Sequence, residues 1–454
     1  MMPHAVLVLA RTVSICAVVS GCAGYRALSL TERPALAPGV AALDRARPGG
    51  LPPVPADQPL TPAELGLLAV QNSPDLRAVR ARRGVAQAQV VEAGLLPDPV
   101  LAGSYNVYLA GPAFANAIGA TLTADVTALI TLSARRRAAR EAAMQVDADV
   151  VWQEWQTISR AQTLAIDLVE QGRLLRSLEQ ALDLLQQRAA LSSRAVAQGN
   201  ATLQVLAPDL AAVTSLQTQH DAAVLAQEQR WQALDALLGL EPAVRPLLAA
   251  PRVPAIAPDE AATLLASLPR RRPDLIALQL GYQAQEANLR AAVLGQFPAL
   301  VLGPNYGEDT TRVQSLGPSV SVALPLFNRN RGRIAIQRAT REQLRTEYAA
   351  RLAAAEGGAR ALLTDLALLQ RQLDGARAGL GQARSLAAGA EAAMRGGLLD
   401  ELSYVQLVVT RLEKERQVIG LEQRVLDERT ALATLLGAGL PPATLTPPKE
   451  PSLL

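Results

Sequence analysis

The stretch Ser319-Val-Ser-Val-Ala-Leu-Pro-Leu-Phe327 alternates apolar residues with small or polar ones. Successive side chains of a strand point to opposite faces, so this alternation predicts a strand with one apolar and one polar face. The polar and basic segment Asn328-Arg-Asn-Arg-Gly-Arg333 follows, and Asn328 is a candidate N-cap for a helical stretch without proline until Pro441. A strand that runs directly into a very long helix is unusual for a soluble enzyme.

The same junction occurs earlier in the chain. The stretch Thr121–Leu132 alternates in the same way, and Ser133 opens another long helical stretch. Short helices with Pro and Asp in the first turn precede both junctions, at Asn72-Ser-Pro-Asp-Leu76 and Arg271-Arg-Pro-Asp-Leu275. The chain is therefore predicted to contain two copies of one plan, about 198 residues apart.

Each copy is predicted to hold a helix, two strands, a long helix and a return helix. The four strands are expected at about residues 100–109, 118–132, 299–306 and 315–327. The first long helix, of about 65 residues, would extend roughly 100 Å and carries a coiled-coil-like leucine stripe. The long helices turn at Gly199-Asn200 and at Gly396-Gly397, because glycine tolerates the left-handed conformation of a C-cap. Return helices are expected at about 202–238, where Pro208 would kink or delay the helix, and at about 399–436.

The expected divisions of the chain follow from composition. They are a signal peptide at 1–21, a lipidated proline-rich tether at 22–60, a first repeat at 61–240, a connector at 241–258, a second repeat at 259–440, and a flexible tail at 441–454. The first repeat opens on Thr61-Pro-Ala-Glu64, a capping-box pattern.

The N-terminus has the features of a secreted bacterial protein. Arg11 precedes a short apolar run, and Val19-Ser-Gly-Cys22 resembles a lipobox, in which Cys22 is acylated after cleavage. The alternative is an ordinary signal peptide that contains a cysteine. Ala23 follows the cysteine, and resemblance to bacterial lipoproteins then favours the outer membrane.

Composition argues against several classes of function. The chain has two histidines and two cysteines, and no clustered metal ligands, phosphate-binding glycine loop or paired-carboxylate site, so we expect no enzyme, cofactor or metal. The chain has no basic stripe with interleaved aromatic residues, so we do not expect it to bind nucleic acid. No apolar run after the N-terminus approaches the ~18–20 residues of a membrane-spanning helix, so any bilayer crossing would use strands.

Four strands cannot close a barrel, and an open edge does not occur in lipid. Three chains would supply about twelve strands, enough for a channel, and would bundle the long helices into a hollow cylinder. Aromatic residues at or beside the strands suit a membrane-interface girdle, although ordinary sheet packing explains them equally well: Tyr105, Tyr108, Phe114, Phe297, Tyr306 and Phe327.

The duplicated plan resembles the TolC-like outer-membrane efflux family. The resemblance covers about residues 60–440 and includes the Pro-Asp-Leu helix starts, the Pro325-Leu-Phe-Asn-Arg-Asn-Arg-Gly332 junction, the glycine turns and the Leu-Leu-Gly ends at Gly239 and Gly437. It implies a mainly α protein with a small β part. Long antiparallel helical hairpins would form an α-barrel, and four strands per chain would contribute to a trimeric 12-stranded transmembrane β-barrel.

The resemblance also implies partners and a location. The protein would be a lipid-anchored homotrimer in the bacterial outer membrane with its helices in the periplasm. The glycine turns Gly199, Asn200, Gly396 and Gly397 would contact a periplasmic adaptor protein, which links to an inner-membrane pump of the RND class. The Leu-Phe-Asn-Arg-Asn form of the junction resembles the heavy-metal cation efflux branch.

Candidate pore residues lie beside the second turn. By resemblance, Asp400, Glu401 and Ser403 would constrict the tunnel entrance; the alternative is that the two acids merely favour a helix N-terminus. Asp167 and Asp365 occupy equivalent places in the two copies and would face either a water-filled lumen or solvent.

Two other functions stay open. One is an outer-membrane channel for multidrug or type I secretion export. The other is a structural coiled-coil lipoprotein that spans the periplasm, which would have no use for strands with alternating faces. A heat-modifiable trimer band resistant to mild detergent would favour the channel.

Overall fold

The computed structural model describes residues 25–47, 52–107, 109 and 115–443. The chain divides into an N-terminal segment that ends at Leu36 and a body that begins at Ala37. The described residues of the N-terminal segment form no helix or strand. Cys22, the expected signal peptide and residues 444–454 of the expected tail lie outside the described residues.

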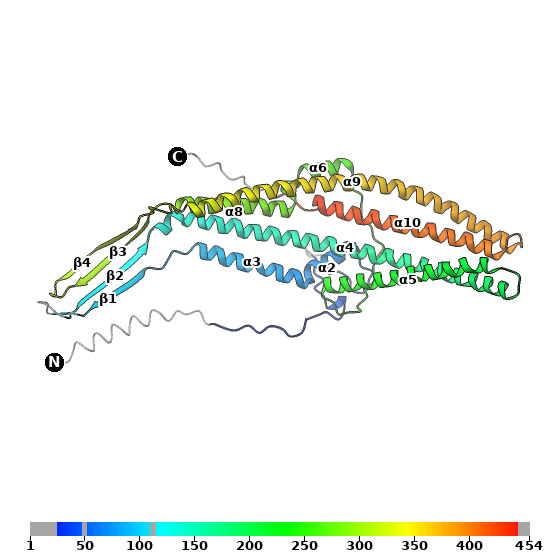
Figure 1. The fold of residues 1–454 in the computed structure, drawn as a ribbon, viewed down its shortest axis with the longest axis horizontal. Coiled ribbons are helices and arrows are strands. Elements are labelled where there is room, and N and C mark those ends of the chain that lie inside the picture. The colour runs from blue at the N-terminus through cyan, green and yellow to red at the C-terminus, as the bar shows by residue number, and fades with distance from the viewer. Residues whose placement is uncertain (1–24, 48–51, 108, 110–114, 444–454) are drawn as a thin grey trace. The chain divides into compact units, whose positions relative to one another are not determined.

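The body repeats one order of elements twice, as the sequence predicts (Figure 1). The first copy consists of α2 (Pro62–Asn72), α3 (Pro74–Ala93), β1 (Val100–Asn106), β2 (Ala117–Asp125), α4 (Thr127–Ala197) and α5 (Leu203–Leu238). The second consists of α6 (Pro258–Ala266), α7 (Leu268–Arg271), α8 (Pro273–Leu294), β3 (Ala299–Glu308), β4 (Gln314–Ala323), α9 (Arg331–Arg395) and α10 (Glu401–Leu436). A short 3-10 helix, η1 (Val40–Ala42), precedes them.

Local sequence sets the helix starts. The Thr61 side chain accepts a hydrogen bond from the Glu64 backbone, and the Glu64 carboxylate accepts one from the Thr61 backbone at 2.9 Å, which confirms the capping box. Both Pro-Asp-Leu motifs begin helices with proline in the first turn, at Pro74 and Pro273.

The four strands form one antiparallel sheet in the order β1-β2-β3-β4. Each copy supplies one hairpin, and β2 pairs with β3 to join the copies, with Thr121 opposite Asn305. The helices that enter and leave the sheet pack in the same order, α3 against α4, α4 against α8 and α8 against α9 (Figure 1). The sheet therefore continues directly into a layer of four helices.

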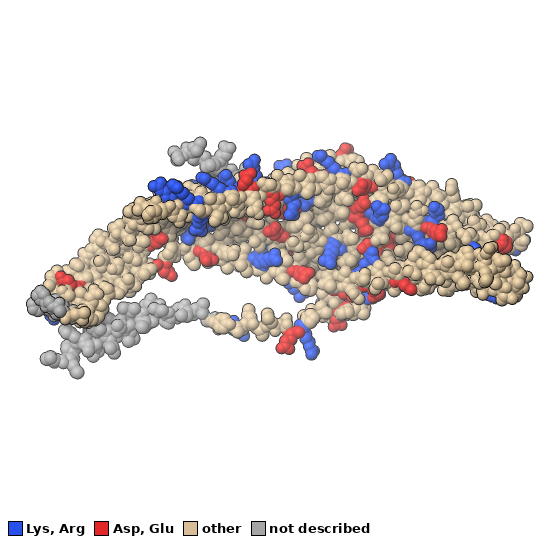
Figure 2. Space-filling view, viewed as in Figure 1, with Lys and Arg blue, Asp and Glu red and all other residues tan. Residues whose placement is uncertain are grey.

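The register places most of the large apolar residues of the four strands on one face of the sheet, because directly paired residues share a face. Large side chains on this face are exposed in the single chain: Leu101, Tyr105, Ile118, Leu122, Leu302, Tyr306, Leu316, Val320 and Val322. The opposite face carries mostly small or polar residues, among them Ser104, Thr121, Thr123, Asn305, Ser319 and Ser321. Figure 2 shows charged side chains spread along the helices and few on the strands.

The structure corrects the end of the second strand of copy one. The alternation predicts a strand as far as Leu132, but β2 ends at Asp125 and α4 begins at Thr127. The Asp125 carboxylate accepts a hydrogen bond from the Thr127 backbone at 2.8 Å, which turns the chain into a helix. Thr127 also accepts a hydrogen bond from the Leu300 backbone at 2.7 Å. A contact from the second copy thus fixes a boundary that the alternation does not mark.

The structure also corrects the junction after β4. This strand ends at Ala323, before Pro325, and Asn330 rather than Asn328 precedes α9. Asn330 has the left-handed φ of 54° and makes no side-chain cap, and its side-chain amide nitrogen donates to the Ala292 carbonyl of α8 at 2.6 Å. The predicted role of Asn328 as N-cap is therefore wrong.

The long helices meet where their leucine stripes predict. Leu178, Leu182 and Leu185 of α4 are buried in a cluster with residues of α5, α9 and α10, and Leu369 and Leu373 of α9 are buried against α10. The helix α5 begins at Leu203, before Pro208, so this proline does not delay it.

Within the described part of the chain, no helix has both the length and the apolar character needed to cross a membrane.

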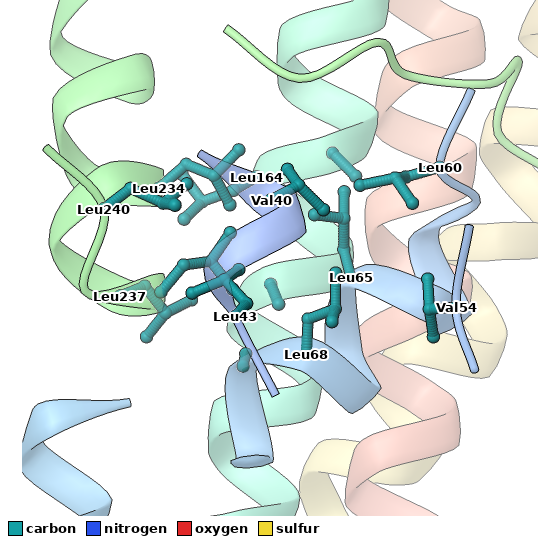
Figure 3. Packing of buried hydrophobic residues seen from close by; sticks show 14 of the residues in the cluster. Val40, Leu43, Val54, Leu60, Leu65, Leu68, Leu164, Leu234, Leu237 and Leu240 are labelled. Carbon is teal, nitrogen blue, oxygen red and sulfur yellow. The ribbon is translucent and has the colours of Figure 1, made fainter. Parts of the chain in front are cut away.

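The last part of the expected tether packs against the body. Residues Val40, Leu43, Val54 and Leu60 are buried with α2, α4 and the end of α5 (Figure 3). Leu60 also forms an isolated bridge with Leu248. The described residues 37–47 and 52–60 are therefore not an extended tether, because their apolar side chains pack against distant parts of the body.

Candidate functional site

Two turns with the same backbone geometry connect the long helices to the return helices. After α4, Gly199 has φ 74°, and the Asn200 amide donates to the Ala195 carbonyl at 2.8 Å. After α9, Gly397 has φ 72°, and the Leu398 amide donates to the Ala393 carbonyl at 2.8 Å. Both are Schellman caps, which require a residue that tolerates positive φ. Gly396 is the ordinary C-cap residue that precedes Gly397.

Asp400 caps the helix that follows the second turn. Its carboxylate accepts hydrogen bonds from the Ser403 hydroxyl at 2.7 Å and from the Ser403 backbone at 2.9 Å. These bonds lower the pKa of Asp400. Glu401 lies in the same first turn and is exposed. An ionised carboxylate therefore sits at this turn at neutral pH, held by the serine three residues on.

The two aspartates that occupy equivalent places in the repeats have different surroundings. Asp167 of α4 is half-buried and accepts hydrogen bonds from Arg230 of α5 at 3.2 Å and from Gln423 of α10 at 2.5 Å. Asp365 of α9 is exposed. Asp167 thus links three helices, whereas Asp365 has no equivalent contact among the described residues.

A second carboxylate that the sequence analysis missed lies beside Asp167. Burial, and then the charge of Asp167, raise the pKa of Asp427 on α10 to about 7. One carboxylate oxygen of Asp427 is buried and has no hydrogen-bond partner within the described residues. Arg230 opposes the shift, while Glu170 and Glu428 add to it. Asp427 therefore changes charge near neutral pH between the two hairpins.

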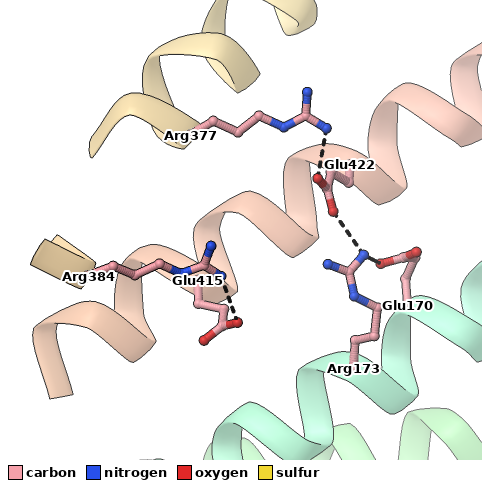
Figure 4. Close-up of polar contacts among 6 residues, drawn as sticks. All are labelled: Glu170, Arg173, Arg377, Arg384, Glu415 and Glu422. Atoms are coloured by element: carbon pink, nitrogen blue, oxygen red, sulfur yellow. Dashed lines mark hydrogen bonds and ion pairs between the residues drawn. The ribbon is translucent and has the colours of Figure 1, made fainter. Parts of the chain in front are cut away.

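A chain of ion pairs also joins the hairpins (Figure 4). Arg173 of α4 contacts Glu170 at 2.6 Å and Glu422 of α10 at 2.8 Å, and Glu422 in turn contacts Arg377 of α9 at 2.9 Å. Burial alone would raise the pKa of Glu422, but the hydrogen bonds from Arg377 and Arg173 outweigh it and lower the pKa. This network connects the first copy to both helices of the second hairpin.

The sequence alone does not reveal which of these charged groups contact one another. Glu170 and Arg173 have the three-residue spacing of a pair on one helix, but Glu422 lies 249 residues from Arg173. Within the described residues, no group of three or more His, Cys, Asp or Glu is placed to hold a metal ion.

Comparison with known proteins agrees with this architecture. Residues 264–438 match the family model described as outer membrane efflux protein. The chain is 28% identical over 407 residues to the pyoverdine export outer membrane protein OpmQ of Pseudomonas putida, covering 82% of this chain and 84% of that protein.

Solved channels have the same fold. The outer-membrane channel OprN superposes with a TM-score of 0.68 at 17% identity, covering 92% of this chain and 99% of OprN. The transmembrane channel CusC superposes with a TM-score of 0.66 at 17% identity, covering 83% of this chain and 91% of CusC. With its duplicated hairpins and four-stranded sheet, the chain has the TolC-like fold of these solved channels, and residues 264–438 of its second repeat match the outer membrane efflux protein family.

Proposed function

We propose that this protein is the outer-membrane channel of a tripartite efflux system and works as a homotrimer. The observation that carries the proposal is the sheet, which exposes large apolar residues on one face and has mostly small or polar residues on the other. Val320 and Leu316 on the apolar face are 62% and 78% exposed. A continuous apolar face across four strands is stable against lipid, and the polar face then suits a water-filled interior.

The outer strands of the sheet, β1 and β4, argue for assembly. Backbone groups on an open sheet edge have no partner in lipid, which makes a four-stranded sheet in a membrane unstable alone. Pairing β1 of one copy with β4 of the next closes a barrel of about twelve strands from three copies. Because the four helices follow the strands in the same order, the same symmetry would close them into a tube on one axis.

The far ends of the hairpins would then form the periplasmic entrance. The Schellman turns at Gly199–Asn200 and Gly396–Gly397 would meet an adaptor protein that links to an inner-membrane pump of the RND class. Leu203 and Leu398 beside them are 70% and 85% exposed, which suits a protein contact. Acylation of Cys22 would add a lipid anchor.

Charged residues near this entrance are proposed to narrow it. Asp400, Glu401 and Ser403 follow the second turn, and the half-buried Asp167 lies deeper between the hairpins. Asp365, which is exposed on α9 in the single chain, is proposed to face the lumen of the trimer. In a closed threefold assembly the carboxylates at the entrance would be brought together in a ring.

Two similarities to known proteins suggest what the channel exports. The Leu326-Phe-Asn-Arg-Asn330 junction resembles that of the heavy-metal cation efflux branch, which makes metal cations the first candidate, with selectivity residing in the pump. A second candidate is pyoverdine, favoured by the similarity to a pyoverdine export protein. Multidrug or type I export is a third. Deleting the gene should raise metal sensitivity in the first case and lower pyoverdine secretion in the second.

The channel proposal can be tested by matched substitutions on neighbouring residues of β4. The change V320R/V322R places charges on the apolar face, at a cost of about 2–4 kcal/mol each at the bilayer midplane, and should abolish membrane insertion. The control S319R/S321R, on the other face, should still give heat-modifiable trimers, with altered conductance in planar bilayers. Equal insertion of both variants, or a wild-type protein that stays monomeric and gives no conductance, would overturn the proposal.

A further inference from the structure

Arginines gather where the strands meet the helices. Figure 2 shows Lys and Arg concentrated over the ends of α8 and α9 that adjoin the sheet. The arginines at this junction are Arg135, Arg136, Arg137 and Arg140 on α4, and Arg329, Arg331, Arg333 and Arg338 at or beside the start of α9. Among the described residues, only Arg137 of this set has a carboxylate within ion-pair distance, Glu141 at 3.8 Å. The excess positive charge therefore has no internal counterpart.

Two of these arginines line one cavity. The cavity, of about 530 Å³, lies between α4, α8 and α9, and Arg135 and Arg333 are its only charged lining residues. The side chains of Asn288 and Asn330 also line it, and no carboxylate does. Two guanidinium groups with neighbouring amides and no acid form a site suited to an anion.

The Arg135 guanidinium has one buried donor that an anion in the cavity could satisfy. One terminal nitrogen of its guanidinium donates to the Leu95 carbonyl at 3.4 Å. Its Nε is buried and has no hydrogen-bond partner among the described residues. A buried donor on a charged group is costly to leave unpaired, and an oxyanion in the cavity could accept from it.

Exposed apolar side chains lie in the chain segments that flank the cavity. Leu95 and Phe297, which follow α3 and α8, are 62% and 55% exposed, and Leu326 and Phe327, which precede α9, are 67% and 96% exposed. If the apolar face of the sheet lies in a bilayer, as proposed above, these residues are at the level where acyl chains give way to head groups. An anion at that level is the phosphate of a phospholipid.

We propose that the cavity between Arg135 and Arg333 binds the phosphodiester head group of an anionic phospholipid in the periplasmic leaflet. The inference rests on the proposed function, because only the membrane position of the sheet brings lipid to the cavity. The two guanidinium groups hold the phosphate, and the apolar residues beside the cavity contact the acyl chains.

Binding of short-chain phosphatidylglycerol to the purified full-length protein, measured by native mass spectrometry, tests this inference. The wild type should bind it about tenfold more tightly than short-chain phosphatidylcholine, and R135Q/R333Q should lose that preference. The variant R135K/R333K, which keeps the charge, should retain part of it. The control R194Q/R371Q removes two exposed arginines, which have no ion-pair partner in the described residues and lie away from the cavity, and should bind like wild type.

Three results would overturn the inference. They are equal affinity for the two lipids, unchanged binding by R135Q/R333Q, and inorganic phosphate binding as tightly as phosphatidylglycerol, which would indicate a soluble anion instead. Conductance of the same samples keeps the two proposals apart. Conducting trimers without lipid preference refute the lipid site alone, whereas protein that forms no conducting trimer refutes the channel.

Discussion

Replacing Arg272 with methionine tests how the second repeat is anchored. Arg272 precedes α8 and is 4% exposed, and it forms a two-point ion pair with the 5% exposed Asp274, at 2.7 and 3.0 Å. It also donates to the Leu435 carbonyl at 3.0 Å, at the end of α10, and lies 4.9 Å from the ring centre of Trp152 of α4. One side chain thus ties three helices together.

The expected loss in the free energy of unfolding follows from the buried charge of Asp274, which R272M leaves without its main partner. Removing one partner of a buried ion pair costs roughly 3–5 kcal/mol, because the other stays buried without compensation. Arg351 lies 3.6 Å from Asp274 and would neutralise part of that charge. We therefore expect the lower end of the range, about 3 kcal/mol, for R272M.

Thermal unfolding of the detergent-solubilised protein, followed by circular dichroism, would measure this effect. Unfolding of such an assembly is expected to be irreversible, so apparent Tm values must be compared at one scan rate. R272M should lower Tm by at least about 3 °C, whereas R272M/D274L, which removes both charges, should recover most of the loss. A Tm for R272M equal to wild type, or a double variant as unstable as R272M, would refute the reasoning.

Three further predictions concern the hairpins. D427N should raise Tm above pH 7, because the raised pKa of Asp427 makes its ionised form unfavourable in the folded state. This gain in Tm should disappear as the pH falls toward 4, where the wild-type carboxyl is protonated, and a gain independent of pH would contradict the prediction. G199A and G397A should each destabilise their turn by about 1 kcal/mol through positive φ alone, since no atom lies within 4 Å of the added Cβ, and faster hydrogen exchange at that turn would report it. D400N/E401Q should raise single-channel conductance if these acids narrow the entrance, and unchanged conductance would leave Asp400 with its capping role only.

The sequence by itself determined the features that depend on neighbouring residues. The capping box at Thr61, the Pro-Asp-Leu helix starts, the two glycine turns and the alternation of the strands each follow from interactions within a few residues. The duplication then gave the order of elements, and the leucine stripes gave the helix faces that pack.

Only the tertiary structure decided what depends on distant partners. At the end of β2, the Leu300 backbone of the other repeat donates a hydrogen bond to the Thr127 hydroxyl and adds a distant partner to the local Asp125–Thr127 bond. Asn330, next to the start of α9, donates its side-chain amide to the Ala292 carbonyl of α8, a contact that only the packed helices create.

The candidate site divides along the same line. The turns and the Asp400 cap were readable because their partners lie three to five residues away. The network through Glu422 and the shifted pKa of Asp427 were not, because their charged partners lie on separate helices, 45 residues away for Arg377 and 249 residues away for Arg173 in the case of Glu422. Local propensity carries no information about which of the many arginines and glutamates will form ion pairs, because the packing of the helices determines which side chains come into contact.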